Sequence, residues 1–330
     1  MIPRRSMLKR GAVALAVMAT VAAGAVAPAF AQDTDLSALT GDITSDGSST
    51  VGPITQAVAE EFSFEAPRVR SSVDISGTGG GFKRFCAGEI DIQNASRPIK
   101  DEEIQACADA GVEFHQVEVA YDGLSIVVNP AADFVECLSI EQLHQLWKKD
   151  APAMTWADLN PEWPADTVNL YGPGTDSGTF DYFVEAVLGE DDIREDFTPS
   201  EDDNVLVEGV AGDANALGYF GYAYYAENQD SLRVVPIDGG DGCVEPSPET
   251  IQDGTYAPLS RPLFIYVTDA ALQRPEVQEF MRFYVANAAE LAADVGFIAS
   301  PDATYEAAAT QLEDAIAGNG GASTEATPGA

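Results

Sequence analysis

The chain has 330 residues, of which 54 are Asp or Glu and 17 are Lys or Arg, so its formal net charge is −37. This length predicts about two domains. Such an acidic surface repels nucleic acid and anionic membranes, which excludes both as expected partners.

The first 31 residues have the order of a secretory signal peptide. Four basic residues lie within the first ten positions, and an apolar, alanine-rich run follows to about Ala27. Ala29-Phe30-Ala31 then forms a small-x-small cleavage pattern. The pair Arg4-Arg5 also resembles a twin-arginine signal. We expect cleavage near Ala31 and a periplasmic or extracellular protein, with an uncleaved membrane anchor as the alternative.

Beyond this segment, predicted strands and helices alternate along the chain, which is typical of an α/β fold. An amphipathic helix with apolar residues at helical spacing follows a strand that leads into Gly47. Strands are then predicted at Val69–Ile75, Ile90–Ala95, Leu124–Val128, Val168–Tyr171, Gly218–Tyr222 and Leu263–Val267. Helices are predicted near Phe82–Ala87, Asp101–Ala110, Ser139–Trp147, Thr179–Leu188, Pro275–Ala288 and Pro301–Ile316.

The helix ends carry further signals. Ser139 with Gln142 three residues later predicts a capping box, and Ser300 is the expected cap of the last helix. The small, polar stretch at 318–330 is expected to be a flexible tail.

Three turns rich in Ser, Thr and Gly each follow a strand and open a helix. Glycine lets the backbone approach a ligand closely, and a helix N-terminus presents free N–H groups that favour an anion. A single turn of this kind is more often a helix cap than a binding site. Three in one chain favour convergence on one anion. The turns are Gly47–Val51, Gly77–Gly81 and Gly174–Thr179.

The residues of these turns, with one further block, resemble a known family. The similarity runs over roughly Thr40 to Ile316, and the blocks occur in the family's order. The chain resembles the periplasmic phosphate-binding proteins, which deliver phosphate to the Pst-type ABC transporter. The blocks are Asp46-Gly47-Ser48-Ser49-Thr50-Val51, Ser76-Gly77-Thr78-Gly79-Gly80-Gly81-Phe82, Asn94-Ala95-Ser96-Arg97-Pro98-Ile99 and Asp176-Ser177-Gly178-Thr179.

The resemblance implies a type II periplasmic binding protein, with two α/β lobes, a two-stranded hinge and a ligand between the lobes. Lobe 1 is expected at 32–119 and 260–317, and lobe 2 at 120–259. The hinge is expected near Val117–Tyr121 and Pro258–Leu263. The implied partners are inorganic phosphate and the membrane permease of an ABC phosphate transporter, and the implied state is a monomer. No cofactor or metal is expected.

The same resemblance implies the ligand-binding residues. Lobe 1 would contact the anion through its first two glycine-rich turns and through Ser96, and lobe 2 through its Ser-Gly-Thr turn. Val51 would do so through its backbone N–H. The implied set is Ser49, Thr50, Val51, Thr78, Gly79, Gly80, Ser96, Arg97, Asp176, Ser177, Gly178 and Thr179.

One departure from the family pattern affects the charged groups. Family members commonly carry Asp where this chain has Arg97, and Arg where it has Gly172-Pro173. We therefore predict that Arg97 supplies the guanidinium, which can donate two hydrogen bonds to phosphate. A surface or interlobe Arg paired with an Asp is the alternative. Asp176 and Asp122 are candidates for the carboxylate that accepts the phosphate proton, which sulfate lacks.

Four cysteines lie beyond the predicted signal, in a compartment where disulfides persist. Four cysteines allow three pairings. The pairing Cys86–Cys107 and Cys137–Cys243 keeps each bridge within one of the implied lobes, and we favour it. A metal site is the alternative, but no metal-ligand spacing supports it.

The sequence supports other classes of function less well than phosphate binding. An exported phosphatase would need a catalytic constellation, but His115 and His144 lie in none, and no G-x-S-x-G motif surrounds Ser177. We expect no enzymatic activity. A binding protein for sulfate or another oxyanion, or an adhesin on the same fold, remains open.

Overall fold

A computed structural model of the chain describes residues 35–152, 154–175, 177–189 and 191–318. The predicted signal peptide, the tail from 319 and Asp176 lie outside the described residues. The fold below concerns the compact unit from Leu36 onward. None of the described helices is long and apolar enough to cross a membrane.

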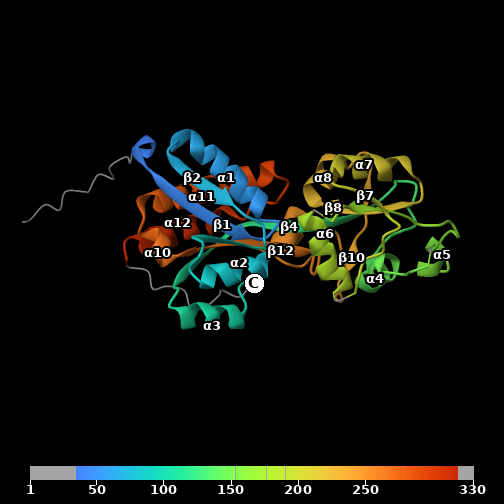
Figure 1. The fold of residues 1–330 in the computed structure, drawn as a ribbon. Helices are drawn as coiled ribbons and strands as arrows, with labels where there is room; N and C mark the ends of the chain where they lie inside the picture. The colour runs from blue at the N-terminus through green and yellow to red at the C-terminus, as the bar shows by residue number, and fades with distance from the viewer. Residues whose placement is uncertain (1–34, 153, 176, 190, 319–330) are drawn as a thin grey trace, which may run out of the picture. The chain divides into compact units, whose positions relative to one another are not determined.

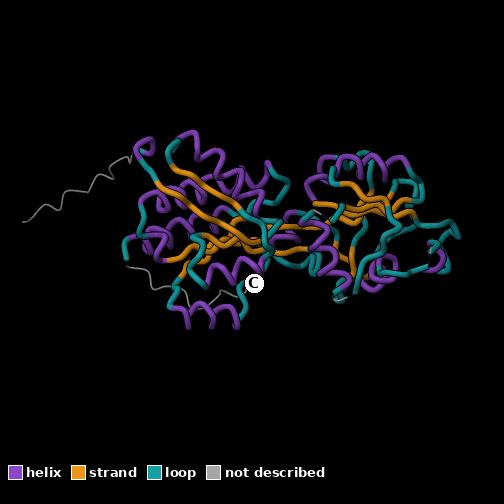
Figure 2. The backbone as a smooth tube through the Cα atoms, in the orientation of Figure 1, coloured by secondary structure: helices purple, strands orange, loops and turns teal. Residues whose placement is uncertain are grey.

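The unit is a mixed α/β fold of two lobes (Figures 1 and 2). The first lobe is formed by elements from both ends of the chain, and the second by elements between them. The first contains η1 (Leu36–Ala38), β1 (Gly41–Gly47), α1 (Gly52–Glu65), β2 (Val69–Val73), α2 (Thr78–Cys86), β3 (Ile92–Ala95), α3 (Asp101–Ala110), α10 (Asp269–Leu272), α11 (Pro275–Asp294) and α12 (Asp302–Ile316).

The second lobe has shorter strands and more loops. It contains β5 (Leu138–Ser139), α4 (Ile140–Trp147), α5 (Trp156–Leu159), β6 (Asn169–Pro173), α6 (Gly178–Phe183), the π-helical turn η2 (Val184–Leu188), β7 (Thr198–Ser200), α7 (Asp203–Gly212), β8 (Ala216–Gly221), α8 (Tyr222–Glu227), β9 (Arg233–Val234), β10 (Ile237–Asp238), β11 (Cys243–Val244) and α9 (Pro248–Gln252).

Two long strands, β4 (Phe114–Val128) and β12 (Ser260–Thr268), connect the lobes. They pair antiparallel from Ser260 opposite Gly123 to Thr268 opposite Phe114, with an irregularity between Leu263 and Phe264. The main sheet has the order β2-β1-β3-β12-β4-β8-β6-β7, with β9 also paired to β4, and β11-β10-β5 form a separate sheet. The two crossovers expected from the sequence are thus neighbouring strands of one sheet, as Figure 1 shows. The lobe bounds assigned from the sequence stay a prediction.

Alternating side chains of the long strands enter cores on opposite faces of the sheet. On β12, Ile265 and Val267 join the core under α1, α11 and α12, whereas Tyr266 joins the aromatic core under α2 and α3. On β4, Ile126 and Val127 divide in the same way between two cores of the second lobe. Each lobe therefore has helices on both faces of its sheet, which fixes the strand ends from which the site is built.

Local sequence signals agree with most element boundaries. The Ser139 hydroxyl accepts a hydrogen bond from the Gln142 backbone N–H at 3.2 Å, and the Gln142 side-chain carbonyl accepts one from the Ser139 backbone N–H. The predicted capping box is therefore confirmed. The prediction for Ser300 is wrong, because α12 begins at Asp302 after Pro301. The Ser300 hydroxyl instead donates to Glu118 at 2.8 Å, because that partly buried carboxylate offers a stronger acceptor.

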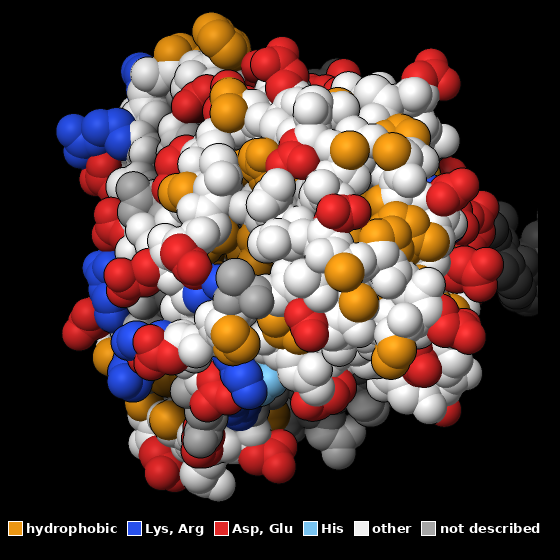
Figure 3. All heavy atoms as spheres, turned by 90° about the vertical axis from the view of Figure 1, so that its right-hand side faces the viewer, with side chains coloured by type: hydrophobic (Ala, Val, Ile, Leu, Met, Phe, Trp, Pro, Cys, Tyr) orange, Lys and Arg blue, Asp and Glu red, His pale blue; other side chains and the backbone are white. Residues whose placement is uncertain are grey.

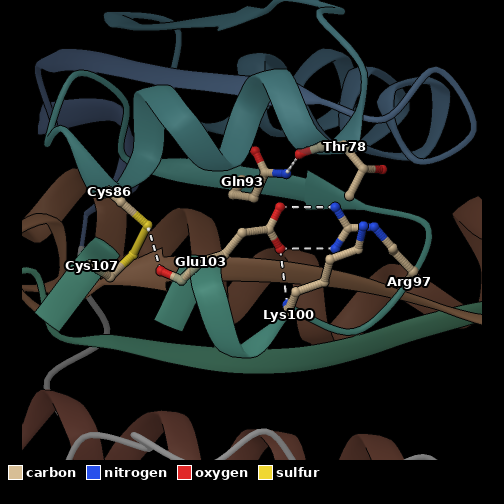
Figure 4. Close-up of a disulfide and its surroundings, with 7 residues drawn as sticks. All are labelled: Thr78, Cys86, Gln93, Arg97, Lys100, Glu103 and Cys107. Carbon is tan, nitrogen blue, oxygen red and sulfur yellow. Dashed lines mark hydrogen bonds and ion pairs between the residues drawn. A yellow bond between two sulfur atoms is a disulfide. The ribbon is translucent and has the colours of Figure 1, made fainter. Parts of the chain in front are cut away.

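The two disulfides connect Cys86 with Cys107 and Cys137 with Cys243. This confirms the predicted pairing. The first bridge joins α2 to the end of α3 (Figure 4), and the second joins the segment before β5 to β11. Each bridge therefore stabilises one lobe and leaves the hinge strands unconstrained.

Candidate functional site

A pocket of about 170 Å³ lies where loops of the first lobe meet α6 and η2 of the second. It is lined almost entirely by hydroxyl, guanidinium and carboxylate groups. The lining residues are Ser48, Ser49, Thr50, Gly77, Thr78, Ser96, Arg97, Asp181, Glu185 and Arg261.

The first wall comes from the loop between β1 and α1. Gly47 has a φ of 132°, a conformation that favours glycine, and turns the chain at the end of β1. The Ser48 hydroxyl then accepts the backbone N–H of Thr50 at 3.1 Å and that of Val51 at 3.4 Å. Val51 itself is fully buried and anchors the loop in the core. The loop is thereby held with the Ser49 and Thr50 side chains toward the pocket.

The second wall combines the N-terminus of α2 with the end of β3. Gly77 precedes the helix with a φ of 77°, and Thr78 and Ser96 share a hydrogen bond of 3.0 Å between their hydroxyls. The Ser96 backbone N–H also donates to the Thr78 hydroxyl at 3.3 Å. Two hydroxyls therefore lie side by side, and because one donates to the other, the pair keeps one proton for an acceptor in the pocket.

Arg97 lies at the pocket wall but is already paired. Its two terminal nitrogens donate to the Glu103 carboxylate at 2.9 and 2.8 Å, as Figure 4 shows. The hydrogen bond with Glu103 is the main cause that raises the pKa of Arg97. The guanidinium also lies over the Phe82 ring, 5.6 Å from its centroid. The geometry leaves the guanidinium of Arg97 engaged by Glu103, so Arg97 is paired as in the alternative weighed from the sequence, but with a Glu instead of an Asp.

Arg261 on β12 was not expected in the site. One terminal nitrogen donates to the Thr50 hydroxyl at 3.0 Å and to Asp122 at 3.2 Å, and its Nε lies 3.3 Å from the same carboxylate oxygen. Asp122 stands directly opposite Arg261 in the register of β4 and β12. The other terminal nitrogen, Nη1, faces Glu185 at 3.7 Å. Nη1 is thus the end of Arg261 nearest to the space available for an anion.

The burial of this pair explains its geometry. The side chains of Arg261 and Asp122 are 12% and 3% exposed. Burial raises the pKa of Asp122, and the neighbouring Arg261 opposes that effect. Because Asp122 is fully enclosed and does not line the pocket, it orients Arg261 rather than facing the anion space. An Arg within the mostly apolar stretch 259–267 is the signal that could have identified it from the sequence.

The third wall is the α6 segment of the second lobe. The Ser177 hydroxyl accepts the Thr179 backbone N–H at 3.1 Å and so caps α6. Gly178 is packed against Thr50 so closely that a Cβ there would lie 2.7 Å from the Thr50 hydroxyl oxygen. One turn further, Asp181 accepts the Ser49 hydroxyl at 3.2 Å. The two lobes therefore touch along one face of α6.

The residues predicted from the sequence fall into three groups. Those that line the pocket are Ser49, Thr50, Thr78, Ser96 and Arg97. Those placed beside it without lining it are Val51, Gly79, Gly80, Ser177, Gly178 and Thr179. Asp176 lies outside the described residues. Ser48 and Gly77 also line the pocket, and they belong to the predicted turns but not to the implied set of ligand residues. The sequence did not identify Asp181, Glu185 or Arg261 as site residues.

The groups that line the pocket are mostly hydrogen-bond donors, with the carboxylates of Asp181 and Glu185 beside them. Hydroxyl and guanidinium donors surround it, which suits an acceptor ligand. His115 and His144 are bound to Asp269 and Asp191 at 2.7 and 2.9 Å, and neither lines the pocket. Within the described ranges, no group of three or more His, Cys, Asp or Glu residues could hold a metal ion.

A larger cavity of about 710 Å³ lies beside the hinge strands, between α9 and α12. Its lining is mixed, with Val117, Phe264 and alanines of α12 beside Gln116 and Glu118. Arg261 reaches both cavities, but the hydroxyls of Thr50, Thr78 and Ser96 line only the smaller one. The chemistry of the lining, rather than the size, therefore identifies the smaller pocket as the candidate anion site.

The surface near the second lobe is acidic, so the site does not depend on a broad positive field. Figure 3 shows Asp and Glu side chains spread over this face, with most of the Lys and Arg side chains toward the left of the view. In the pocket, each Arg is also paired with a carboxylate. An anion would be held mainly by local donors, which act at short range where salt screens little.

Comparisons with known proteins place these features in context. Residues 27–288 match the family model described as a PBP superfamily domain. The chain is 44% identical over 304 residues to Protein SphX of Synechococcus elongatus, covering 91% of this chain and 88% of the relative. It is 41% identical over 278 residues to the phosphate-binding protein PstS of Staphylococcus saprophyticus, covering 84% and 86%.

Solved structures agree with the fold. A possible phosphate binding protein from Planctomyces limnophilus has a TM-score of 0.81 and 47% identity, covering 84% of this chain and 99% of that one. An ABC-type phosphate transport receptor from Vibrio cholerae has a TM-score of 0.60 and 24% identity, covering 78% and 100%. The second likeness concerns the fold alone.

Proposed function

Because the chain belongs to the periplasmic phosphate-binding protein family, we propose that it binds inorganic phosphate between its lobes and delivers it to an ABC-type importer. The observation that carries this proposal is the position of Arg261. Its Nη1 faces the pocket while its other nitrogens are fixed by Asp122 and Thr50. A preorganised guanidinium beside four hydroxyls is suited to a tetrahedral oxyanion.

The proposed binding residues follow from the walls of the pocket. Arg261 donates from the hinge, and Ser49, Thr50, Thr78 and Ser96 donate from the first lobe. Val51 contributes its backbone N–H if the Ser48 hydroxyl is displaced by a phosphate oxygen. The roles predicted for Arg97, Asp176 and the Ser177–Thr179 turn stay predictions.

Capture by closure of the lobes is the proposed mechanism. The contacts of Asp181 with Ser49 and of Gly178 with Thr50 cross between the lobes, so they form only when the lobes are together. Opening at β4 and β12 would separate them and admit the ligand. Phosphate stabilises the closed form because both lobes then contact it. The closed form is the one proposed to dock at the importer.

Delivery to an importer requires that the protein works outside the cytoplasm. The N-terminal pattern before Ala31 and the two disulfides support export, since disulfides persist in oxidising compartments. We propose that the mature protein is a periplasmic or extracellular monomer without a cofactor. We propose binding rather than catalysis as its role, because the PstS relative is described as a phosphate-binding protein and the Planctomyces limnophilus structure as a possible one.

Calorimetric titration of the phosphate-stripped protein from Gln32 onward tests this function. Phosphate is titrated first and sulfate second, at the same ionic strength. Micromolar or tighter phosphate binding with little sulfate binding supports the proposal. Preference for sulfate or another oxyanion would leave the fold assignment unchanged but would change the proposed ligand. Binding of neither anion would overturn the proposal. Turnover of a phosphate monoester would instead favour the phosphatase reading.

A further inference from the structure

A fully buried amide lies behind the glycine-rich walls of the pocket. Gln93 belongs to β3, has none of its surface exposed to solvent, and does not line the pocket. Burial of an amide costs free energy unless its donors and acceptors are paired. The hydrogen bonds of Gln93 therefore indicate what this side chain does.

The nitrogen of this amide joins two walls of the pocket. Gln93 Nε2 donates to the backbone carbonyls of Thr78 and Asn94, each at 2.9 Å, and Figure 4 shows the bond to Thr78. The Asn94 carbonyl also accepts the Ser48 backbone N–H at 2.9 Å. Because both partners are carbonyl oxygens, the amide must present its nitrogen to them. Gln93 thus connects the first residue of α2 to the end of β3 and, through it, to the turn after β1.

Two glycines make room for this amide. A Cβ added at Gly47 would lie 2.9 Å from both Nε2 and Oε1 of Gln93, and one added at Gly81 would overlap Oε1. Among the described residues, Oε1 has no hydrogen-bond partner. A buried acceptor left unpaired costs free energy, so Gln93 is a poor choice for stability alone. The two bonds of its nitrogen explain its place in the fold.

On the basis of the proposed phosphate site, we propose that Gln93 is a positioning residue that holds Thr78 with its hydroxyl toward the bound anion. The Thr78 hydroxyl lines the pocket beside Ser96, while the carbonyl of the same residue is held by Gln93. Thr78 lies between Gly77 and Gly79–Gly81, and glycine gives the backbone much freedom. A bond to the Thr78 carbonyl limits that freedom before the ligand arrives, which reduces the cost of binding.

A second buried side chain ties the same turns together, so loss of Gln93 alone should leave them folded. Asp46 accepts the Gly47 backbone N–H at 2.7 Å and the Ser76 hydroxyl at 2.8 Å. Neither bond reaches Thr78, so Asp46 does not share the role proposed for Gln93. Removal of Gln93 should therefore change phosphate affinity more than it changes the fold.

The test is a double-mutant cycle in which calorimetry measures the phosphate affinity of the mature protein. Gln93→Met keeps the length of the side chain but removes both hydrogen bonds. We expect it to weaken phosphate binding about tenfold, which is the effect of one misplaced donor to a charged ligand. In a chain that also carries Thr78→Val, no hydroxyl is left at position 78 to be held. There, Gln93→Met should weaken binding by less than about threefold.

Asn129→Leu is the matched control. Asn129 also donates one amide nitrogen to two backbone carbonyls, those of Val210 and Ala211, at 3.0 and 2.7 Å. It belongs to the second lobe and does not line the pocket. Asn129→Leu should lower the temperature of unfolding and leave phosphate affinity unchanged. A merely structural role of Gln93 would give the same result for Gln93→Met.

The outcomes separate this inference from the proposed function. If wild-type protein does not bind phosphate, the proposed function fails and this inference fails with it. If wild-type protein binds phosphate and folded Gln93→Met keeps the wild-type affinity, only the inference is overturned. An equal loss with and without Thr78→Val also overturns it, because Gln93 would then act through another residue. Thermal unfolding identifies the folded variants. If Gln93→Met does not fold, Gln93→Asn, whose side chain is one methylene shorter, replaces it in the cycle.

Discussion

The Arg261 guanidinium on β12 lies over the ring of Tyr182 on α6, with 3.6 Å between its central carbon and the ring centroid. Tyr182 in turn donates its hydroxyl to the Pro258 backbone carbonyl at 2.8 Å. Arg261 of the hinge therefore contacts both lobes. The face of its guanidinium packs on Tyr182 of the second lobe, and one of its nitrogens donates to Thr50 of the first lobe. Such contact on a ring face favours Arg over Lys.

Replacement of Arg261 by Lys should weaken phosphate binding about tenfold or more, even though the charge is kept. Lys cannot reach Asp122, Thr50 and the ligand with one planar group. Titration calorimetry at fixed ionic strength measures the change. Arg97→Ala is the comparison, and we expect a smaller loss because Glu103 occupies its fork. If Arg97→Ala bound phosphate within threefold of the wild-type affinity, Arg97 would no longer be counted among the residues that bind the ligand.

Replacement of Arg261 by Met should destabilise the protein by about 3–5 kcal/mol, because it leaves the enclosed Asp122 carboxylate without a partner. Asp122→Asn in the same chain should recover much of that loss. Urea unfolding of phosphate-free protein measures both effects. Equal stability of the single and double variants would contradict the assignment of Asp122 as the partner that fixes Arg261.

Gly178→Ala should weaken phosphate binding without unfolding either lobe. A Cβ at Gly178 would lie 2.7 Å from the Thr50 hydroxyl oxygen and 2.9 Å from its backbone nitrogen, so the lobes could not close as they do. Gly212→Ala on α7 is the matched control, because nothing lies within 4 Å of its added Cβ. We expect the control to keep wild-type affinity. Equal affinity of both variants would show that this contact does not limit closure.

Removal of the two disulfides should have unequal effects on stability. Cys137–Cys243 spans 106 residues and Cys86–Cys107 spans 21. By the entropy of loop closure, replacement by alanine costs about 5 kcal/mol for the first and about 3 kcal/mol for the second. Chemical unfolding of the two double variants tests the order. The opposite order would mean that interactions in the unfolded chain dominate.

The raised pKa of Asp203 predicts that the free energy of unfolding decreases as pH rises. Burial is the main cause that raises its pKa from 3.8 to about 6, with Asp202 and Glu201 adding repulsion. The unfolded chain then releases this proton at lower pH than the folded chain, so stability falls between about pH 4 and pH 6. Asp203→Asn should remove this decline and gain about 3 kcal/mol at pH 7. Thermal unfolding across this pH range measures it, with Asp230→Asn on the exposed surface as control.

The sequence predicted the parts of this site that depend on local chemistry. Turns such as Gly77–Gly81 combine glycine with hydroxyl residues at a helix start, and both disulfides followed once the lobes were assigned. Arg261 was missed because its role depends on the register that sets it opposite Asp122, which a strand pattern does not contain. Glu185 was missed because a single exposed Glu on a helix is ordinarily a solvated surface residue.

The place of β12 in the sheet has a consequence for the order in which the chain can fold. This strand separates β3 from β4, although it follows both by more than a hundred residues. The amino-terminal half therefore exposes two unpaired strand edges until residues 260–268 arrive. Contacts between such distant segments form slowly. A newly made chain accordingly stays without a finished first lobe until nearly all of it has been synthesised.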